Sequence, residues 1–479
     1  MNNKPLLTTL ALAVALAVSG CAMLEPQLPQ ADAAIPAEWP LPPTTASGKT
    51  AATVRAGAPA AMEQAVADIG WSDFFIDPKL KKLIARALDN NRDLRVAMLN
   101  VERARALYNI QRADRFPSVG ANAALNRSGG NVANPGSVYS ASIGTAFELD
   151  LFGRVHNLSN AALQQYFAQE EARRSAQLAL IAEIAGAYLS LAADMESQRV
   201  AQATLDSQQS AYDLIVKRHE LGAVSALDLA QAQTTVETAR ADMARYAGLV
   251  ATDINALRLL VGAPVEAELL PQGFDLAVSG IAPLPAQLPS QTLLRRPDVL
   301  QAEHLLRSAN ANIGAARAAF FPSISLTGSI GSASTELSGL FESGTRIWSF
   351  VPQISLPIFQ GGRLTANLGA AKADRDIALA RYEKSIQAGF REVADALALT
   401  KTLAERRAAQ QALAEAAGRV HQLSKVRYEQ GQDSFLNLLD AQRSLYAAQQ
   451  GLVAAQQAEQ SNRVNLYKVL GGGWVESSK

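Results

Sequence analysis

The sequence predicts an α+β fold built twice from one unit of helix, two strands, long helix, turn and returning helix. Three observations support this prediction. A motif at 218–233 recurs 209 positions later, at 427–442. Long stretches without proline surround both copies, which is typical of long helices packed as coiled coils. Two pairs of segments with alternating apolar and polar residues lie near 116–126 and 138–151, and near 321–331 and 347–359.

The composition indicates a helical protein without a strong charge preference. The 479 residues include 44 basic and 44 acidic side chains, and only 6% are aromatic. A formal net charge of zero argues against a nucleic-acid partner. The abundant alanine favours long helices whose backbones approach closely.

The start of the chain has the pattern of a secretory signal peptide over 1–20. A basic residue, Lys4, is followed by an apolar run over 6–18 and by two small residues directly before Cys21. The sequence ending at Cys21 resembles a bacterial lipobox, which implies lipidation of this cysteine. Ala22 in the next position implies release to the outer membrane. The alternative is a signal peptide followed by an unrelated cysteine.

The rest of the chain divides into four segments. Residues 21–75 are rich in proline and are predicted to be extended. The first repeat covers 76–264, a proline-containing linker follows at 265–289, and the second repeat covers 290–479. Within the repeats we expect long helices over 154–220 and 364–429, with returning helices over 225–261 and 434–470.

The predicted strands carry one apolar and one polar face over roughly ten residues, which fits transmembrane β-hairpins. Ordinary amphipathic hairpins are the alternative. We find no later uninterrupted run of 18 apolar residues, and expect no transmembrane helix after the signal. Four strands cannot close a barrel, and open edges are not tolerated in lipid. Several copies of the chain would therefore have to share one barrel.

Each repeated motif has the features of the tip of a helical hairpin. In the first tip, 218–229, Gly222 is expected to end the incoming helix in the left-handed conformation. Ser225 and Asp228 fit a capping box for the outgoing helix, and Val224 with Leu229 fits a hydrophobic staple.

The second tip, 427–438, has the same plan with a weaker predicted cap. Gly431 and Ser434 take the places of the first glycine and serine. Asp433 and Asn437 replace the staple and box residues, so the cap is expected to be weaker.

No pattern predicts an enzyme. The four histidines, at 156, 219, 304 and 421, are far apart and lack metal-ligand spacing. Gly471–Gly473 is not followed by the Lys-Ser/Thr of a phosphate-binding loop. We therefore predict no catalytic residue, no metal site and no cofactor.

The ordered motifs resemble those of the TolC-like outer membrane factors, specifically the lipoprotein branch that serves tripartite multidrug exporters. The resemblance covers essentially the whole mature chain. It is carried by the lipobox, both tips, Phe-Pro-Ser before each strand pair, Leu294–Asp298 (Leu-Arg-Arg-Pro-Asp), and the ending Val464–Trp474. It implies a homotrimer with a twelve-stranded barrel in the outer membrane lipid and a helical tunnel in the periplasm. It also implies docking to a periplasmic adaptor and a proton-driven, RND-type inner-membrane pump.

The resemblance also implies roles for residues at the tips. One docking edge for the adaptor would comprise Leu221, Gly222, Ala223, Val224, Ser225 and Leu227, and the other Gly431, Gln432, Asp433, Ser434 and Leu436. A purely structural turn is the alternative for each of them.

A gate is expected just after the second tip. Asp440 lies four residues after Leu436, on the same helix face, and Gln231 holds the equivalent place in the first repeat. By resemblance these two residues would narrow the periplasmic end of the channel, with three carboxylates in a ring. Arg218 and Arg427 are candidate partners that lock the tips shut. A solvated helix face is the alternative.

Two other protein classes share some of these features. A periplasmic adaptor lipoprotein would carry one helical hairpin, whereas this sequence predicts two. A structural envelope lipoprotein without a conducting pore is the second alternative.

Overall fold

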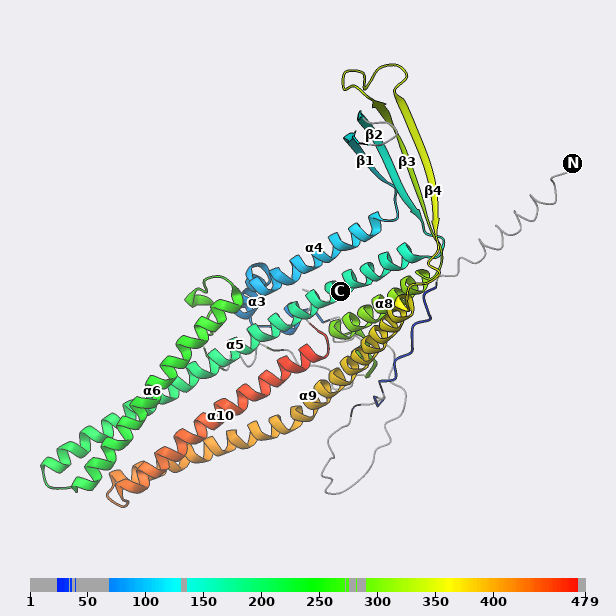
Figure 1. The fold of residues 1–479 in the computed structure, drawn as a ribbon. Coiled ribbons are helices and arrows are strands. Elements are labelled where there is room, and N and C mark those ends of the chain that lie inside the picture. Colours follow the sequence, from blue (N-terminus) through cyan, green and yellow to red (C-terminus); the bar gives the residue numbers. More distant parts are fainter. Residues whose placement is uncertain are drawn as a thin grey trace. The chain divides into compact units, whose positions relative to one another are not determined.

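The computed structural model describes residues 24–33, 35–36, 39, 69–130, 136–271, 273–274, 281 and 290–472. The signal peptide and Cys21 lie outside the described residues. The first part of the chain forms α2 (Trp71–Phe74), α3 (Pro78–Asn90), α4 (Arg92–Ala113), β1 (Ser118–Ser128), β2 (Gly136–Leu149), α5 (Arg154–Glu220) and α6 (Ala226–Val261) (Figure 1). The second part forms the 3-10 helices η2 (Ala267–Leu269) and η3 (Ser290–Arg295), then α8 (Pro297–Ala318), β3 (Ser323–Ser334), β4 (Arg346–Ser355), α9 (Arg363–Glu429) and α10 (Phe435–Val469).

The order of helix, two strands, 67-residue helix and shorter helix therefore occurs twice. The bounds of the long helices lie within one residue of those expected. The strands differ more, because β4 ends at Ser355 rather than near 359. Pro357 explains this end, since proline cannot donate a backbone hydrogen bond to a neighbouring strand.

The chain divides into two compact units that do not coincide with the two repeats. The first unit contains the residues up to Ala33, Leu99–Glu171 and Leu300–Ser385, and the second contains Ala34–Met98, Ala172–Val299 and Ile386–Lys479. Each unit takes segments from both repeats. The compact units therefore differ from the sequence repeats, because the strands of both repeats pair in one sheet.

The first unit contains an antiparallel sheet with the strand order β1-β2-β3-β4. The register aligns Ile143 of β2 with Ile330 of β3, and Ile330 with Trp348 of β4. Because side chains alternate between the faces of a strand, these three residues share one face. The neighbouring row, Gly144, Ser329 and Ser349, belongs to the other face. The sheet thus has the apolar and polar faces that the alternating sequence predicted.

Apolar side chains of this sheet are exposed within the single chain. Trp348 is 75% exposed, Phe350 61% and Ile354 69%. β1 and β4 form the two edges of the sheet, each paired on one side among the described strands. An exposed apolar face with two open edges requires further partners in the functional protein.

The second unit holds a hydrophobic core between the base of the two helical hairpins and residues 69–94. Tyr467 of α10 stacks on Phe74 of α2, with ring centroids 3.9 Å apart. Its hydroxyl donates a hydrogen bond to the Ile69 carbonyl at 2.6 Å. Tyr188 of α5 donates to Asp77 at 2.8 Å, just before α3. These contacts fix residues 69–77 to helices from both repeats.

Arg296 explains the Leu-Arg-Arg-Pro-Asp motif. Its guanidinium is 9% exposed and pairs with Asp298 at 2.7 Å and with Glu392 of α9 at 2.8 Å. It also donates to the Val469 carbonyl at the end of α10 at 2.8 Å. One buried arginine therefore satisfies a helix end and joins α9 to α10 within the second unit.

One helix passes a length-and-hydropathy test for a membrane span. An 18-residue window of α5 has a mean hydropathy of 1.5, and 56% of that window is buried inside the protein. The sequence analysis considered uninterrupted apolar runs only, and this window of α5 is not such a run. Its burial shows that these apolar side chains serve the packing of the helix.

Candidate functional site

The first tip closes by a network of local hydrogen bonds. Gly222 adopts φ +71°, and the backbone N–H of Ala223 donates to the Arg218 carbonyl at 2.8 Å. Ser225 Oγ accepts from the Asp228 N–H at 3.1 Å, while the Asp228 carboxylate accepts from the Ser225 N–H at 3.1 Å. This reciprocal pair is the predicted capping box. His219 completes the tip, with Nδ1 3.1 Å from the Val224 carbonyl oxygen.

The second tip has the same backbone closure and a different cap. Gly431 has φ +72°, and the Asn437 N–H reaches Ser434 Oγ at 3.3 Å without a reciprocal bond. The sequence analysis did not predict that Asp433 itself accepts hydrogen bonds at the start of α10. Its carboxylate accepts from the Ser434 N–H at 3.0 Å and from the Asn437 side chain. These bonds, with Arg427 nearby, hold the pKa of Asp433 below its usual range.

The two expected lock residues make different contacts. Arg427 pairs with Asp433 of its own tip, with Nε and Oδ2 3.4 Å apart. Arg218 reaches the second tip, where it donates to the Tyr428 hydroxyl at 3.0 Å and lies 5.5 Å from the centre of that ring. Of these two arginines, only Arg218 contacts the other tip among the described contacts. Tyr428 was not singled out from the sequence.

A ladder of polar contacts continues this connection along the hairpins. Gln208 of α5 donates to Gln442 of α10 at 2.9 Å. Tyr446 of α10 donates to Asp242 of α6 at 3.1 Å. Further along, the Tyr246 hydroxyl donates to Gln450 at 2.8 Å. These side chains bring the second hairpin's returning helix against the first hairpin.

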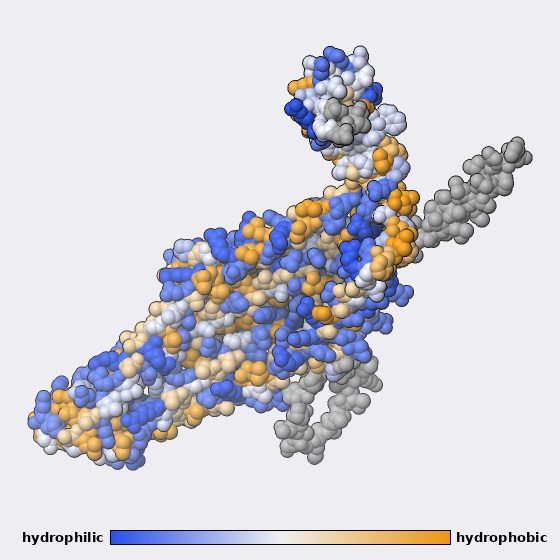
Figure 2. Space-filling model, in the orientation of Figure 1, coloured by the Kyte–Doolittle hydropathy of each residue, from blue (hydrophilic) through white to orange (hydrophobic). Residues whose placement is uncertain are grey.

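The tips present apolar side chains to solvent. Leu221 is 85% exposed and Leu227 66% exposed, whereas Val224 packs against a small cluster under the tips. In Figure 2, hydrophobic residues are visible among polar ones at the surface of the tips. The exposed positions are Leu221, Gly222, Ala223, Ser225, Leu227, Gly431, Gln432, Ser434 and Leu436, and Val224 and Asp433 are half-buried. Leu221 and Leu227 are therefore available for apolar contacts with a partner.

The Leu436–Asp440 face is exposed as the helical spacing predicts. Leu436 is 47% exposed, while its neighbours Leu438 and Leu439 are buried under the tips. The sequence analysis did not include Arg443, whose Nη1 lies 3.4 Å from Asp440 Oδ1. Both side chains of this pair are more than half exposed, so the pair is weak and Asp440 stays accessible.

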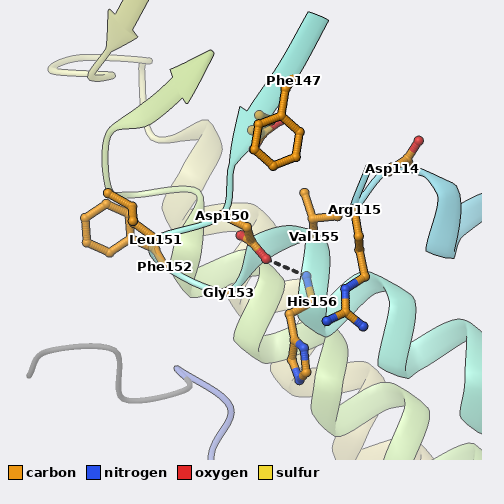
Figure 3. Close-up of a pocket in the computed structure, with 10 residues that line it drawn as sticks. Asp114, Arg115, Phe147, Asp150, Leu151, Phe152, Gly153, Val155 and His156 are labelled. Atoms are coloured by element: carbon orange, nitrogen blue, oxygen red, sulfur yellow. Dashed lines mark hydrogen bonds between the residues drawn. The ribbon is translucent and has the colours of Figure 1, made fainter. Parts of the chain in front are cut away.

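A pocket of about 380 Å³ lies in the first unit, where β2 leads into α5. In Figure 3, Asp150 points at the backbone nitrogen of His156, which donates to Oδ2 at 2.7 Å. Glu148 binds Arg154 through two hydrogen bonds of 2.9 and 2.6 Å. Both carboxylates thus stabilise the first turn of a long helix, where negative charge is favourable. The polar groups of this pocket serve the strand-to-helix junction.

The described residues hold no group of three or more His, Cys, Asp or Glu side chains placed to bind a metal ion. Two of the histidines have structural partners: His219 in the first tip, and His304, whose Nδ1 lies 2.8 Å from Gln164.

Comparison with known proteins identifies the family. A model of the outer membrane efflux protein family matches residues 83–263 and 288–472. The chain belongs to this family. Members of the family are outer membrane channels for efflux, and this protein is one of them.

Named relatives of this outer membrane efflux protein match it over nearly the full length. The probable efflux pump outer membrane protein TtgC of Pseudomonas putida is 45% identical over 98% of this chain and 96% of the relative. Outer membrane protein OprJ of Pseudomonas aeruginosa is 44% identical over 99% and 97%.

Solved structures have the same fold. The open state of the MtrE outer membrane channel of Neisseria gonorrhoeae has a TM-score of 0.83 at 38% identity, covering 95% of this chain and 99% of that one. A crystal structure of CusC has a TM-score of 0.81 at 38% identity, covering 94% and 100%. The outer membrane efflux protein therefore extends from the outer membrane into the periplasm.

Proposed function

We propose that three copies of this outer membrane efflux protein form the exit duct of a tripartite efflux pump. The observation that carries the proposal is the four-stranded sheet with two open edges and an exposed apolar face. Three such sheets supply twelve strands, above the minimum of about eight for a membrane barrel. Joining β4 of one copy to β1 of the next closes every edge.

The helical hairpins are proposed to form the periplasmic tunnel, with both tips docking to an adaptor protein. Leu221 and Leu227 offer apolar contacts, and Gln432 and Asp433 offer polar ones. The adaptor would connect the duct to an inner-membrane pump. The exported compounds follow from the pump, because a passive duct selects little.

Leu436 and Asp440 are proposed to form the periplasmic gate. Three copies of Asp440 would place a ring of carboxylates at the narrow end, which favours cations. Arg218 would hold the second tip through Tyr428, and Arg427 would shape that tip through Asp433. Such exposed contacts contribute less than about 1 kcal/mol each, so adaptor binding could displace them.

Cys21 is proposed to carry the lipid anchor of the mature chain. Each buried methylene of an acyl chain contributes about 0.8 kcal/mol to membrane binding. The barrel and the acyl chains would then hold the protein in the same membrane.

Planar-bilayer recording of the purified protein tests the channel and the gate together. We expect stable, cation-favouring steps, with higher conductance and weaker cation preference for Asp440→Ala. Gln231→Ala, at the equivalent place in the first repeat, serves as the matched control and is expected to behave as wild type. Unchanged conductance and selectivity in Asp440→Ala would remove the gate from this position. A protein that forms no steps at all would instead support a structural envelope lipoprotein.

Site-directed cross-linking tests the docking proposal. Single cysteines at 221, 223 and 227 are expected to cross-link to the adaptor in cells, whereas a cysteine at exposed Thr234, further along α6, is not. Docking at the first tip is ruled out if none of the three tip positions reacts.

A further inference from the structure

The segment that follows Cys21 is bound in a specific site on the first unit. Arg317 of α8 donates to the Leu24 carbonyl at 3.0 Å. The amide of Asn310, also on α8, donates to Glu25 Oε1 at 3.1 Å and to the Pro26 carbonyl at 2.7 Å. Glu25 Oε2 lies 3.5 Å from the amide of Asn160 on α5. We call these three side chains, Asn160, Asn310 and Arg317, the N-terminal clasp.

The clasp is built into the helix packing. Asn310 is 2% exposed, so its side chain cannot turn to solvent. Both groups that it faces on the segment are acceptors, which fixes its amide with the NH₂ group towards them. A buried amide that donates twice to an extended segment is a specific contact, because its donors would otherwise be left unsatisfied.

The same segment continues to a third helix. The backbone N–H of Asp32 donates to Glu383 of α9 at 3.1 Å. The segment therefore contacts α5 from the first repeat and α8 and α9 from the second. It joins the two repeats within the first unit.

The duplicated fold offers only one such site among the described residues. The Phe-Pro-Ser motifs align at an offset of 205, which places Arg105 opposite Asn310 and Arg112 opposite Arg317. The long helices align at an offset of 209, which places Gly369 opposite Asn160. Without the two asparagines, the equivalent surface lacks the amides that hold Glu25.

The clasp lies close to the sheet-to-helix junction. Arg317 is one residue before the end of α8, and the exposed Phe320 and Phe321 follow directly, at 38% and 41% exposure. Aromatic side chains at such places mark the membrane interface of barrels. Three residues of extended chain span at most about 10 Å, so Cys21 stays within that reach of Leu24.

We propose that the N-terminal clasp positions the lipid anchor, so that acyl chains on Cys21 enter the bilayer beside Phe320 and Phe321. This inference rests on the proposed lipidation of Cys21. The clasp aligns the anchor with the periplasmic rim of the barrel and thereby sets the height of the channel in the membrane.

Spin-label mobility tests whether the clasp holds the segment. The label is placed on Gln27→Cys, an exposed position next to the clasped residues, in the full-length protein in lipid nanodiscs. We expect an immobilised label in the parent protein. Arg317→Ala should lower the ratio of docked to free segment about tenfold, because a hydrogen bond from a charged donor is lost. Arg112→Ala, the matched control from the other repeat, should leave the label immobilised.

Variants of the segment itself avoid any disturbance of helix packing. Glu25→Ala should raise the mobility of the label, and Glu25→Gln, which keeps the acceptor oxygen for Asn310, should restore most of the immobilisation. Equal mobility in the parent, Arg317→Ala and Glu25→Ala proteins would overturn the clasp.

A photoreactive fatty acid, incorporated during growth, tests the position of the lipid. In the parent protein, acyl chains on Cys21 should cross-link to peptides containing Phe320 and Phe321, and Arg317→Ala should reduce this product about tenfold while acylation is unchanged. Identical cross-links in both proteins would overturn the positioning role. If mass spectrometry finds no acyl chain on Cys21, the lipidation proposal and the positioning role both fail, and the mobility experiment still decides whether the clasp exists.

Discussion

The two helical hairpins of this outer membrane efflux protein share a backbone plan and differ in their charges. α5 and α9 have the same length of 67 residues, and both tips turn at a glycine with φ near +70°. An offset of 209 therefore aligns the hairpins residue by residue. The differences between them lie in side chains that connect the two helices of each hairpin.

In the first hairpin, two acids face each other between α5 and α6. Asp253 lies beside Asp194, and burial, the neighbouring charge and a hydrogen bond to it raise the pKa of Asp253 to about 6. The aligned residues of the second hairpin are Leu403 and Asn462, which carry no charge. The first hairpin thus holds a carboxyl group whose pKa is about 6.

In the second hairpin, a buried glutamate lies between two arginines. Glu459 of α10 pairs with Arg407 of α9 at 2.6 Å and with Arg463 at 3.0 Å, and its side chain is only 8% exposed. The aligned residues of the first hairpin are Gln198, Val250 and Ile254. The stability of the first hairpin therefore depends on the protonation of Asp253. The second hairpin is instead joined by the ion pairs of Glu459.

Among the changes that test this difference between the hairpins, removing the two arginines should lower the free energy of unfolding the most. The double variant Arg407→Ala and Arg463→Ala leaves the Glu459 carboxylate buried and unpaired. Because the arginines themselves are about 40% exposed, we expect a loss of about 2 kcal/mol, below the range for fully buried pairs. Thermal unfolding followed by helical circular dichroism measures it.

Two further variants identify the cause of this loss. Adding Glu459→Gln to the double variant removes the unpaired charge and should recover part of the stability. Gln198→Ala, aligned with Arg407 in the first hairpin, is the control and should stay within about 0.5 kcal/mol of wild type. If the triple variant is no more stable than the double one, an unpaired charge is not the reason for the loss.

The long helices, the strand pairs and the caps could be predicted from the sequence because each depends on local signals. Gly222 and Ser225 define the first tip by backbone conformation and a hydrogen bond three residues away. Asp253, Glu459 and the clasp residue Asn310 gave no such signal. Their partners Asp194, Arg407 and Glu25 lie 59, 52 and 285 positions away, so the packing of helices brings these pairs together. Only Arg463, the second partner of Glu459, is close in the sequence, at a spacing of four.

The sequence also predicted the exposed face of the candidate gate, but it did not indicate Arg443 as the partner of Asp440. The spacing of Leu436 and Asp440 predicted one exposed face, and both are exposed. Arg443 lies on that face too, at a spacing of three, but many charged residues of the long helices have such neighbours. Likewise, nothing near Arg218 in the sequence indicated Tyr428 of the other tip as its partner.

The pH-dependent protonation of Asp253 should have the next largest effect on the free energy of unfolding. The pKa of Asp253 is about 6 in the folded protein and 3.8 as its ordinary value, so between these values the folded state binds more protons than the unfolded state. Stability from this group is complete below about pH 4 and is lost as the pH rises through 6. Because the pair is partly exposed and screened by solvent, we expect a loss of about 1 kcal/mol between pH 4 and pH 7.

Asp253→Asn should remove this component of the pH dependence and leave the protein more stable than the parent at pH 7. Thermal unfolding at a series of pH values compares the two proteins. Asp242→Asn, an acid on the same helix whose partner is Tyr446 of the second hairpin, is the control for a general effect of charge. Parallel pH curves for Asp253→Asn and the parent would show that the acid pair does not distinguish the hairpins.

The caps of the two tips should give the smallest difference. Ser225→Ala removes the hydroxyl that accepts from the Asp228 N–H and keeps the backbone N–H that donates to the Asp228 carboxylate; it should cost about 1 kcal/mol, in the middle of the range for such residues. Ser434→Ala should cost about 0.5 kcal/mol, because its bond of 3.3 Å is longer and Asp433 still binds both the Ser434 N–H and the Asn437 side chain. Hydrogen exchange of the backbone amides at the starts of α6 and α10 measures each local opening.

Adding Asp433→Ala to Ser434→Ala should raise the cost at the second tip to that of Ser225→Ala at the first tip. Equal exchange in the two single variants would mean that the tips are equally capped, and that the hairpins differ only in their buried charges.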